Sequence, residues 1–279
     1  MQIAIQGALG SFHHQAALAL DTQATIVPQQ TFAGVFSAVQ SGEAEYGLCA
    51  IENTLYGSIN EVYRLLEQHN VWILRDIRLQ IAQHLIGPRA VTLAELASSP
   101  DVQILSQAPA LAQVERWLAT HLPNAVVETA HDTAGSVQAV VELDKPHTLA
   151  IAGRLAASTY NGVVVAKNIQ DDQHNYTRFI LFSGKSQRNP LAAHGSLILK
   201  TNHQPGALVH ALQIFADNGS NLTKVDSHPI PDDARHYAFY IDYTLPNHDS
   251  SAIIDSLQKQ GCSVKLLGEY VVGPTVQTT

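Results

Sequence analysis

The chain has 279 residues, enough for two domains, and 46% of them are hydrophobic, which excludes a disordered chain and allows proper cores. The formal net charge of −8 argues against binding to nucleic acid or to an anionic membrane, so an anionic substrate would need a locally positive pocket. The two cysteines, Cys49 and Cys262, form no C-x-x-C motif, so we expect both to be reduced thiols. The sequence shows neither a basic leader nor an apolar run of spanning length, so we expect a cytoplasmic protein.

The first part of the chain alternates strands and helices. In order, we predict a strand at 2–6, a helix at 12–20, a helix at 31–40, a strand at 46–51 and a helix at 59–68. Ser11 is placed to cap the first helix, and Thr31 the second. The glycine turn at 7–12 points backbone N–H groups at one spot, which favours an anion site, although an ordinary βα turn has the same pattern.

A polar turn at 52–58 follows the buried strand at 46–51. Ligands of open α/β sheets gather at such carboxyl ends of strands. Asn53 and Thr54 are therefore candidates for a ligand site, although both residue types are also common in turns and caps.

A second series begins after extended segments at 71–86 and a Gly87-Pro88 stop. In order, we predict a helix at 92–97, a strand at 102–105, a helix at 110–121 with Pro109 near its first turn, a strand at 125–129, a helix at 133–141, and shorter elements at 149–151, 153–160 and 163–165. This alternation predicts a mostly parallel sheet with helices on both sides. The break into two series predicts two lobes with a ligand cleft between them.

The stretch at 168–182 predicts a strand from Tyr176 onward, because its residues are aromatic, β-branched and apolar. Neighbouring side chains of a strand face opposite ways, so Thr177 shares a face with Phe179, and Arg178 lies on the other face. By itself, such a Thr-Arg pair is typical of a surface cross-strand pair.

A polar, aperiodic linker at 183–194 separates a different pattern. In order, we predict a strand at 196–201, a helix at 206–218, strands at 221–227 and 236–243, a helix at 249–260 and a strand at 263–270. This β-α-β-β-α-β order is typical of a ferredoxin-like domain. The apolar helix start at 204–208 favours binding the carboxylate of a small amino acid.

Motifs of metal, nucleotide and nucleophilic chemistry are missing from the sequence. The 14 histidines form no H-E-x-x-H pair, and no P-loop, dinucleotide fingerprint or G-x-S-x-G elbow occurs. We therefore expect a reaction without metal or cofactor, or no reaction at all.

Ordered sequence blocks carry a family resemblance. Four blocks resemble prephenate dehydratase: Gly-Ala-Leu-Gly-Ser-Phe-His-His-Gln-Ala-Ala at 7–17, Val-Phe-Ser-Ala-Val-Gln-Ser-Gly-Glu-Ala-Glu-Tyr-Gly at 35–47, Ile-Glu-Asn-Thr-Leu-Tyr-Gly-Ser at 51–58 and Asn-Tyr-Thr-Arg-Phe at 175–179. Two further blocks resemble an ACT regulatory domain: Pro-Gly-Ala-Leu at 205–208 and Asn-Leu-Thr-Lys-Val-Asp-Ser-His-Pro at 221–229. Their order along the chain is stronger evidence than any single block.

The resemblance implies a two-lobed, periplasmic-binding-protein-like (type II) catalytic domain at 1–183 and a ferredoxin-like ACT domain at 195–273. One lobe would comprise roughly 1–77 with 152–183, and the other 78–151. The implied reaction converts prephenate to phenylpyruvate with loss of water and carbon dioxide. The implied partners are L-phenylalanine as effector and further copies of the chain, in a homodimer or homotetramer.

The resemblance also implies roles for particular residues. Thr177 is the candidate hydroxyl donor to the leaving hydroxide, and Asn53 and Thr54 would orient the substrate. The expected substrate-binding residues are Ser11, Phe12, Gln107, Arg178 and Phe179. The expected effector-binding residues are Pro205, Gly206, Ala207, Leu208, Asn221, Leu222, Asp226, Ser227, His228 and Pro229.

Three positions depart from the family pattern. Ser-Gln-Ala-Pro-Ala-Leu at 106–111 stands where the family has Ser-His-Pro-Gln-Ala-Leu, so Gln107 is the substitute for the missing glutamine. Gln83 stands at an expected histidine, and Asp-Ser-His-Pro at 226–229 replaces Glu-Ser-Arg-Pro. The departures at 83 and 107–109 leave a non-catalytic sensor of aromatic acids or amino acids open as an alternative. An arogenate dehydratase is a further alternative, because the sequence does not separate the two substrates.

Overall fold

The computed structural model describes residues 1–202, 204–230 and 233–278. The chain forms two compact units. The first comprises Met1–Ser58, Arg78–Phe179 and the residues from Thr275 on; the second comprises Ile59–Ile77 and Ile180–Pro274. This division differs from the predicted domain ranges in grouping residues 59–77 with the C-terminal part of the chain.

One sheet has the order β16-β5-β11-β3-β1-β2, and its strands β5 and β11 have residues in both units. Its strands are β1 (Gln2–Gln6), β2 (Thr25–Gln29), β3 (Tyr46–Asn53), β5 (Trp72–Gln80), β11 (Tyr176–Ser183) and β16 (Thr275–Val276), and β4 (Gly57–Ser58) pairs with β3. The strands β1, β2 and β3 are parallel, so their carboxyl ends meet at one edge of the sheet. Two helices follow β1 and β2: α1 (Phe12–Leu20) and α2 (Phe32–Ser41). The predicted caps Ser11 and Thr31 are both confirmed.

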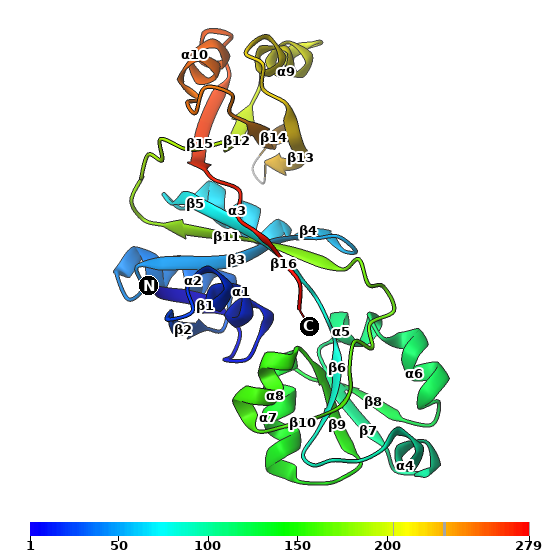
Figure 1. The fold of residues 1–279 in the computed structure, drawn as a ribbon. Coiled ribbons are helices and arrows are strands. Elements are labelled where there is room, and N and C mark those ends of the chain that lie inside the picture. The colour runs from blue at the N-terminus through cyan, green and yellow to red at the C-terminus, as the bar shows by residue number, and fades with distance from the viewer. Residues whose placement is uncertain (203, 231–232, 279) are drawn as a thin grey trace. The chain divides into compact units, whose positions relative to one another are not determined.

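A second sheet of the first unit has the order β10-β6-β9-β7-β8. Its strands are β6 (His84–Gly87), β7 (Gln103–Ser106), β8 (Val126–Thr129), β9 (Thr148–Ala152) and β10 (Val163–Ala166). Strands β7, β8 and β9 are parallel, whereas β6 runs antiparallel to β9 and β10. Figure 1 shows helices on both sides of this sheet, α4 (Leu93–Ser98) and α6 (Glu115–His121) on one side, α7 (Thr133–Leu143) and α8 (Arg154–Tyr160) on the other. The two predicted βα series are thereby confirmed.

The single helix predicted at 110–121 is wrong, because the structure has two: α5 (Ala108–Ala112) and α6. Val114 leaves the helical conformation with φ −127° and ψ 11°. Asp171 stabilises the break: its N–H donates to the Gln113 carbonyl at 2.7 Å, and its carboxylate accepts the N–H groups of Arg116 and Trp117, each at 2.9 Å. A carboxylate from a distant segment therefore caps α6.

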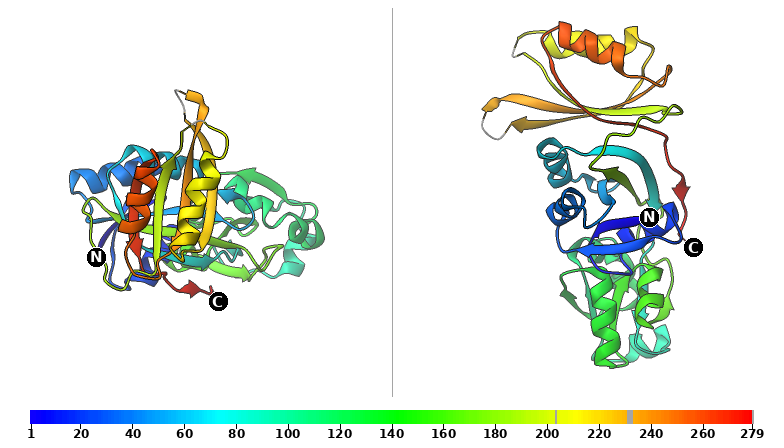
Figure 2. Two further views of the ribbon diagram at one scale, coloured as in Figure 1. Left: turned by 90° about the horizontal axis from the view of Figure 1, so that it is seen from above. Right: turned by 90° about the vertical axis from the view of Figure 1, so that its left-hand side faces the viewer.

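The second unit contains a four-stranded antiparallel sheet in the order β13-β14-β12-β15. Its elements are β12 (His194–Lys200), α9 (Ala207–Asp217), β13 (Leu222–Ile230), β14 (Asp233–Thr244), α10 (Ser251–Lys259) and β15 (Ser263–Tyr270), which we call the C-terminal module. Figure 2 shows α9 and α10 on one face of this sheet, where Leu197, Leu199 and Phe215 are fully buried. The predicted β-α-β-β-α-β order is confirmed, but β13 and β14 extend beyond the predicted strands into the Pro- and Asp-rich segment that was expected to be a loop.

The same unit contains α3 (Asn60–Gln68), which immediately precedes β5. Among the described residues, none of the helices combines the length and hydropathy needed to cross a membrane.

Candidate active site

The end of β3 and the start of β11 are joined by hydrogen bonds through Thr54. Its backbone N–H donates to the Tyr176 carbonyl at 2.9 Å, and its hydroxyl oxygen accepts the Tyr176 N–H at 3.0 Å. The Thr54 hydroxyl itself donates to the His174 carbonyl at 3.0 Å. These bonds hold Asn53 beside Thr177. The Thr54 hydroxyl both donates and accepts a hydrogen bond to backbone groups in this arrangement.

The Asn53 side chain fixes the orientation of the Thr177 hydroxyl. Its Oδ1 accepts the N–H groups of Leu55 and Tyr56, at 2.9 and 3.1 Å, so its Nδ2 must face the other way. That Nδ2 donates to Thr177 Oγ1 at 3.0 Å. Because Oγ1 is an acceptor in this bond, the hydroxyl proton is directed elsewhere, and no described residue accepts it.

Asn175 belongs to the same polar cluster, although no role was predicted for it from sequence. Its Oδ1 accepts Asn53 Nδ2 at 2.7 Å, and its own Nδ2 is buried with no hydrogen-bond partner among the described residues. Asn175 is fully buried, Thr177 is 8% exposed and Asn53 is 9% exposed. Asn175 could have been identified from sequence, because it lies two residues before Thr177 and the side chains of alternate strand residues share a face.

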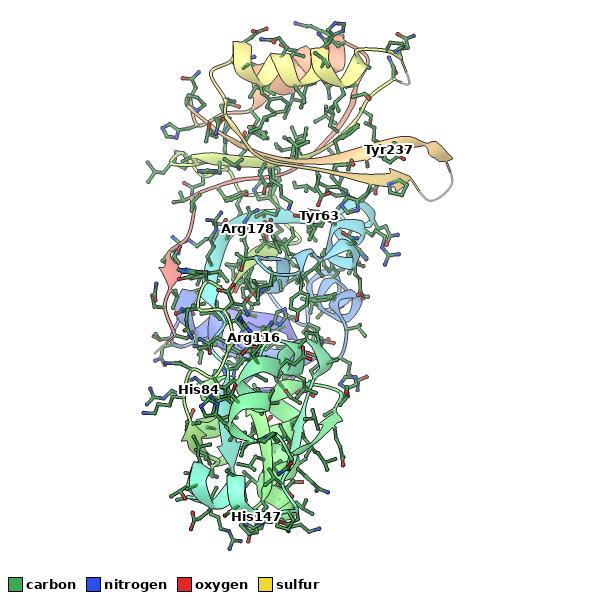
Figure 3. All side chains as sticks on the ribbon, turned by 90° about the vertical axis from the view of Figure 1, so that its right-hand side faces the viewer. Tyr63, His84, Arg116, His147, Arg178 and Tyr237 are labelled. Atoms are coloured by element: carbon green, nitrogen blue, oxygen red, sulfur yellow. The ribbon has the colours of Figure 1, made fainter. Side chains whose placement is uncertain are left out.

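The opposite faces predicted for Thr177 and Arg178 are confirmed. Arg178, labelled in Figure 3, lines a cavity of about 330 Å³ together with Tyr176, Arg78 and Glu52. Thr177 is not part of that lining. Phe179 is 1% exposed and its ring contacts the His13 ring edge-on, with 5.0 Å between centroids. Phe179 therefore packs beneath the strand rather than lining an open surface.

The imidazole ring of His13 is buried against Phe179 of β11 and is neutral near pH 7. Its Nε2 accepts the Ala50 N–H at 3.1 Å, and its ring lies between those of Phe32 and Phe179. Burial of the ring lowers the pKa of His13 to about 3. Its accepting nitrogen is already used, so His13 is not available as an acid or base near pH 7.

The remaining predicted substrate residues lie around the neighbouring turn and α5. Ser11 Oγ accepts the His14 N–H at 3.3 Å as the cap of α1, and Phe12 packs so closely on Gly153 that an added Cβ would lie 2.9 Å from its ring. Gln107 precedes α5, is exposed and makes no side-chain cap bond. The Tyr56 hydroxyl donates to the Pro109 carbonyl at 3.1 Å, so the turn after Asn53 contacts α5.

Gln83, the departure noted in sequence, belongs to a glutamine network. Its Nε2 donates to Gln113 Oε1 at 2.9 Å, and its backbone N–H donates to Gln170 Oε1 at 3.0 Å. Its own Oε1 is buried without a hydrogen-bond partner among the described residues.

The predicted effector residues divide between two faces of the C-terminal module. On β13, Asp226 and His228 are partly buried, whereas Ser227 and Pro229 are exposed. Leu222 packs against the module core, and Gly206 has the left-handed φ of 82° at the start of α9, beside Pro205, Ala207 and Leu208. Asn221 is exposed and its carbonyl accepts the Thr244 N–H at 2.9 Å.

Among the described residues, no three side chains of His, Cys, Asp or Glu lie close enough together to hold a metal ion.

A family model for prephenate dehydratase matches residues 3–187 of this chain. The chain belongs to the prephenate dehydratase family. Prephenate dehydratases are lyases that dehydrate and decarboxylate prephenate, a step of aromatic amino acid biosynthesis.

Similar relatives span nearly the whole chain. A bifunctional chorismate mutase/prephenate dehydratase of Aquifex aeolicus is 31% identical over 97% of this chain and 73% of its own length. Arogenate dehydratase/prephenate dehydratase 2 of Arabidopsis thaliana is 31% identical over 99% of this chain and 74% of its own.

Solved structures confirm the two-lobed fold with its C-terminal module. A prephenate dehydratase of Arthrobacter aurescens in complex with L-Phe has a TM-score of 0.85 and 27% identity, over 99% of this chain and 92% of its own. GqqA, described as a quorum-quenching acylase, has a TM-score of 0.86 and 28% identity, over 98% and 99%.

Among the described residues, Ser99, Asp101 and His147 form a serine–histidine–aspartate group. Ser99 Oγ and Asp101 Oδ1 both approach His147 Nδ1, at 2.9 and 2.8 Å, and Ser99 also donates to Asp101. A nucleophilic serine needs the opposite ring nitrogen as its base. This group therefore lacks the geometry of an acyl-transfer triad.

Proposed function

We propose that this chain converts prephenate to phenylpyruvate with Thr177 as the hydrogen-bond donor to the departing hydroxide. The observation that carries the proposal is the bond from Asn53 Nδ2 to Thr177 Oγ1, which leaves the hydroxyl proton available. The low exposure of both side chains strengthens such a bond, because little water competes with it.

The reaction needs little more than that donor. The electron pair of the C–C bond to the departing carboxylate moves into the ring, and the ring C–O bond breaks to release hydroxide. The hydroxide becomes water with a proton that comes finally from solvent. Aromatisation of the ring drives both bond cleavages, so a fixed hydroxyl group supplies the stabilisation that the leaving group requires.

The test is steady-state turnover of prephenate by the purified protein, without added metal or cofactor, followed by the absorbance of phenylpyruvate. Turnover is expected. Tight binding of phenylpyruvate with no turnover would favour the non-catalytic sensor instead.

Arogenate is the second candidate substrate, because relatives named arogenate dehydratase match 97–99% of this chain. Arogenate has an amino group where prephenate has a keto oxygen, and elimination at the ring is the same. A comparison of kcat/KM for the two substrates decides between them.

The C-terminal module is proposed to be an ACT domain that binds L-phenylalanine and joins copies of the chain. The support is its β-α-β-β-α-β order and the solved relative bound to L-Phe. Its strands β13 and β15 lie at the two edges of its sheet, and large apolar side chains such as Val209 and Leu191 are 67% and 71% exposed. We also propose a cytoplasmic location.

A further inference from the structure

The side-chain amide of Asn53 orients two hydrogen-bond donors. Its Oδ1 accepts the backbone N–H groups of Leu55 and Tyr56, so the other end of the amide is its NH2 group. The two hydrogens of that group are directed at two side chains of the same segment. Asn175 Oδ1 accepts at 2.7 Å, and Thr177 Oγ1 accepts at 3.0 Å.

Asn175 is thereby fixed in one orientation. Because its Oδ1 accepts from Asn53, its Nδ2 is the donor end of the amide and is directed elsewhere. Asn53 Nδ2 also lies 3.2 Å from the Tyr176 carbonyl, a longer contact that shares one of the same two hydrogens. Asn175 is fully buried, and its Nδ2 has no hydrogen-bond partner among the described residues.

Asn175 lies where the chain crosses between the two sheets of the first unit. It belongs to the segment that joins β10 to β11, and its carbonyl accepts the N–H of Ile81, from the segment that joins β5 to β6, at 2.8 Å. Ligands of two-lobed proteins bind between the lobes, beside such crossings. The enclosed amide is therefore placed where a ligand reaches it when the lobes part and then close around the ligand.

An enclosed donor without an acceptor destabilises the free protein. The N–H group has lost its hydration and has gained no hydrogen bond in return. A ligand that brings an oxygen atom to Asn175 Nδ2 restores the missing bond, whereas a ligand with only apolar atoms there does not. The buried amide thus selects for an acceptor atom on the ligand.

We propose that Asn175 is a second catalytic donor: its Nδ2–H group binds the departing hydroxyl oxygen of the substrate together with the Thr177 hydroxyl. The two residues are two positions apart, at and just before the start of β11, and the same Asn53 amide orients both. The substrate oxygen has lone pairs for both bonds. The amide keeps its protons, and the hydroxide takes its proton from solvent. This inference rests on the proposed function.

Two donors on one oxygen act mainly on the chemical step. A hydrogen bond to a developing hydroxide is stronger than one to a neutral hydroxyl group, so the second donor lowers the barrier more than it tightens substrate binding. Phenylpyruvate has lost the oxygen, and its binding leaves Asn175 Nδ2 without an acceptor again. The same amide therefore favours release of the product.

Binding of two stable ligands tests the inference without turnover. Tetrahydroprephenate keeps the ring hydroxyl group, but its saturated ring cannot become aromatic; the second ligand is the same molecule without that hydroxyl. Calorimetry on the wild type should give about three- to tenfold tighter binding of the hydroxylated ligand. In Asn175→Leu, this ratio should fall at least threefold. Asn124→Leu, at an exposed asparagine, is the control and should keep the ratio. An unchanged ratio in Asn175→Leu would overturn the inference.

The kinetics of Asn175→Asp give the second readout. Its carboxylate can still accept from Asn53 Nδ2, so the orientation of Thr177 is kept, while the donor is replaced by a negative charge beside the forming hydroxide. At pH 8, kcat should fall at least tenfold. The loss relative to the wild type should shrink as the pH is lowered, since a protonated carboxyl group again provides a donor.

A loss of kcat in Asn175→Asp that stays the same from pH 8 to pH 5 would show a purely structural role and overturn the inference. No turnover of prephenate by the wild type would instead contradict the proposed function. The ratio of the two binding constants would then decide whether Asn175 recognises the hydroxyl oxygen.

Discussion

In the proposed mechanism, Thr177 and Asn53 have different roles. Thr177 would provide the hydroxyl proton, and Asn53 would determine where that proton points, because its Nδ2 can only donate and does so to Thr177 Oγ1. Each role can be removed separately by a small change in side-chain chemistry.

Replacing Thr177 removes the donor itself. We expect Thr177→Ala to lower kcat about 10²–10³-fold, the usual effect of losing one donor to a developing anion. Thr177→Ser keeps the hydroxyl and should retain most of the activity, apart from a loss due to the freer side-chain rotation. Steady-state kinetics on prephenate measure both. If the two variants were equally active, Thr177 would have no part in the mechanism.

Replacing Asn53 by aspartate changes the hydrogen-bond direction with almost no change of shape. The carboxylate can still accept the Leu55 and Tyr56 N–H groups, but its second oxygen would attract the Thr177 proton instead of donating to Oγ1. We expect Asn53→Asp to lose at least as much kcat as Asn53→Ala near pH 7. Higher activity of the aspartate variant than of the alanine variant would contradict this arrangement.

His13 predicts the pH dependence of stability. Its folded-state pKa of about 3 lies below the value of 6.5 in an unfolded chain, so the folded state binds fewer protons between these two values. Its contribution is complete above pH 6.5 and is lost as the pH falls toward 3, by about 1.4 kcal/mol per pH unit.

Denaturant unfolding between pH 7 and pH 4 measures this contribution. His13→Leu should flatten the dependence of unfolding free energy on pH. The control is His210→Leu, at an exposed histidine, which should keep the slope of the wild type. Identical slopes for the His13 variant and the wild type would show that the ring is not buried in solution.

At the scale of elements, the short strand β16 closes the edge of the first sheet. It pairs in parallel with β5, placing Thr275 opposite Arg78 and Val276 opposite Leu79. Gln277 Nε2 donates to the Tyr176 hydroxyl at 3.2 Å, and the Thr278 hydroxyl donates to the Gln80 carbonyl at 3.1 Å. This segment thus binds the residue next to Thr177.

Truncation after Pro274 should therefore destabilise the first unit. Loss of the ladder and two side-chain bonds is expected to remove about 1–2 kcal/mol, which lowers Tm by roughly 2–6 °C. Truncation after Val276 keeps the ladder and should cost less than half as much. Calorimetry of both variants checks the order, and equal Tm values for the two would contradict a role for the β16 ladder.

The local elements were predictable from sequence because their signals are local. Ser11, Thr31 and the Thr92–Glu95 capping box all bond to N–H groups within three residues. The break between α5 and α6 was not predictable, since the carboxylate of Asp171 that caps α6 comes from more than 50 residues away. Strand β16 has too few residues to show any periodicity.

The candidate site was predictable only in part, for the same reason. The alternation of strand residues placed Thr177 and Arg178 on opposite faces, and family blocks identified Asn53. The bond between Asn53 and Asn175 joins residues more than 100 positions apart, and so do the bonds from Lys265 Nζ to the carbonyls of Leu66, Glu67 and His69. Without the folded chain, nothing in sequence distinguishes these residues from surface polar groups.

At the scale of the whole molecule, the edge strand β13 of the C-terminal module and exposed apolar side chains such as that of Val209 predict self-association. We expect sedimentation velocity at micromolar concentration to show a dimer or tetramer, because unpaired strand edges and exposed apolar side chains are both covered in that way. Val209→Glu, on the exposed face of α9, should weaken the assembly, whereas the exposed lysine variant Lys259→Glu serves as the charge-change control. A wild-type monomer at this concentration would contradict the prediction.

The pairing of β16 with β5 also affects how the protein is made. The two strands are about 200 residues apart in sequence, so at typical rates of synthesis the ribosome needs roughly 10–40 s to produce the second after the first. During that interval, the backbone N–H and C=O groups of β5 that later pair with β16 can form hydrogen bonds with strands of neighbouring nascent chains. Slower expression or lower temperature, which lowers the concentration of such chains, should therefore raise the yield of folded protein.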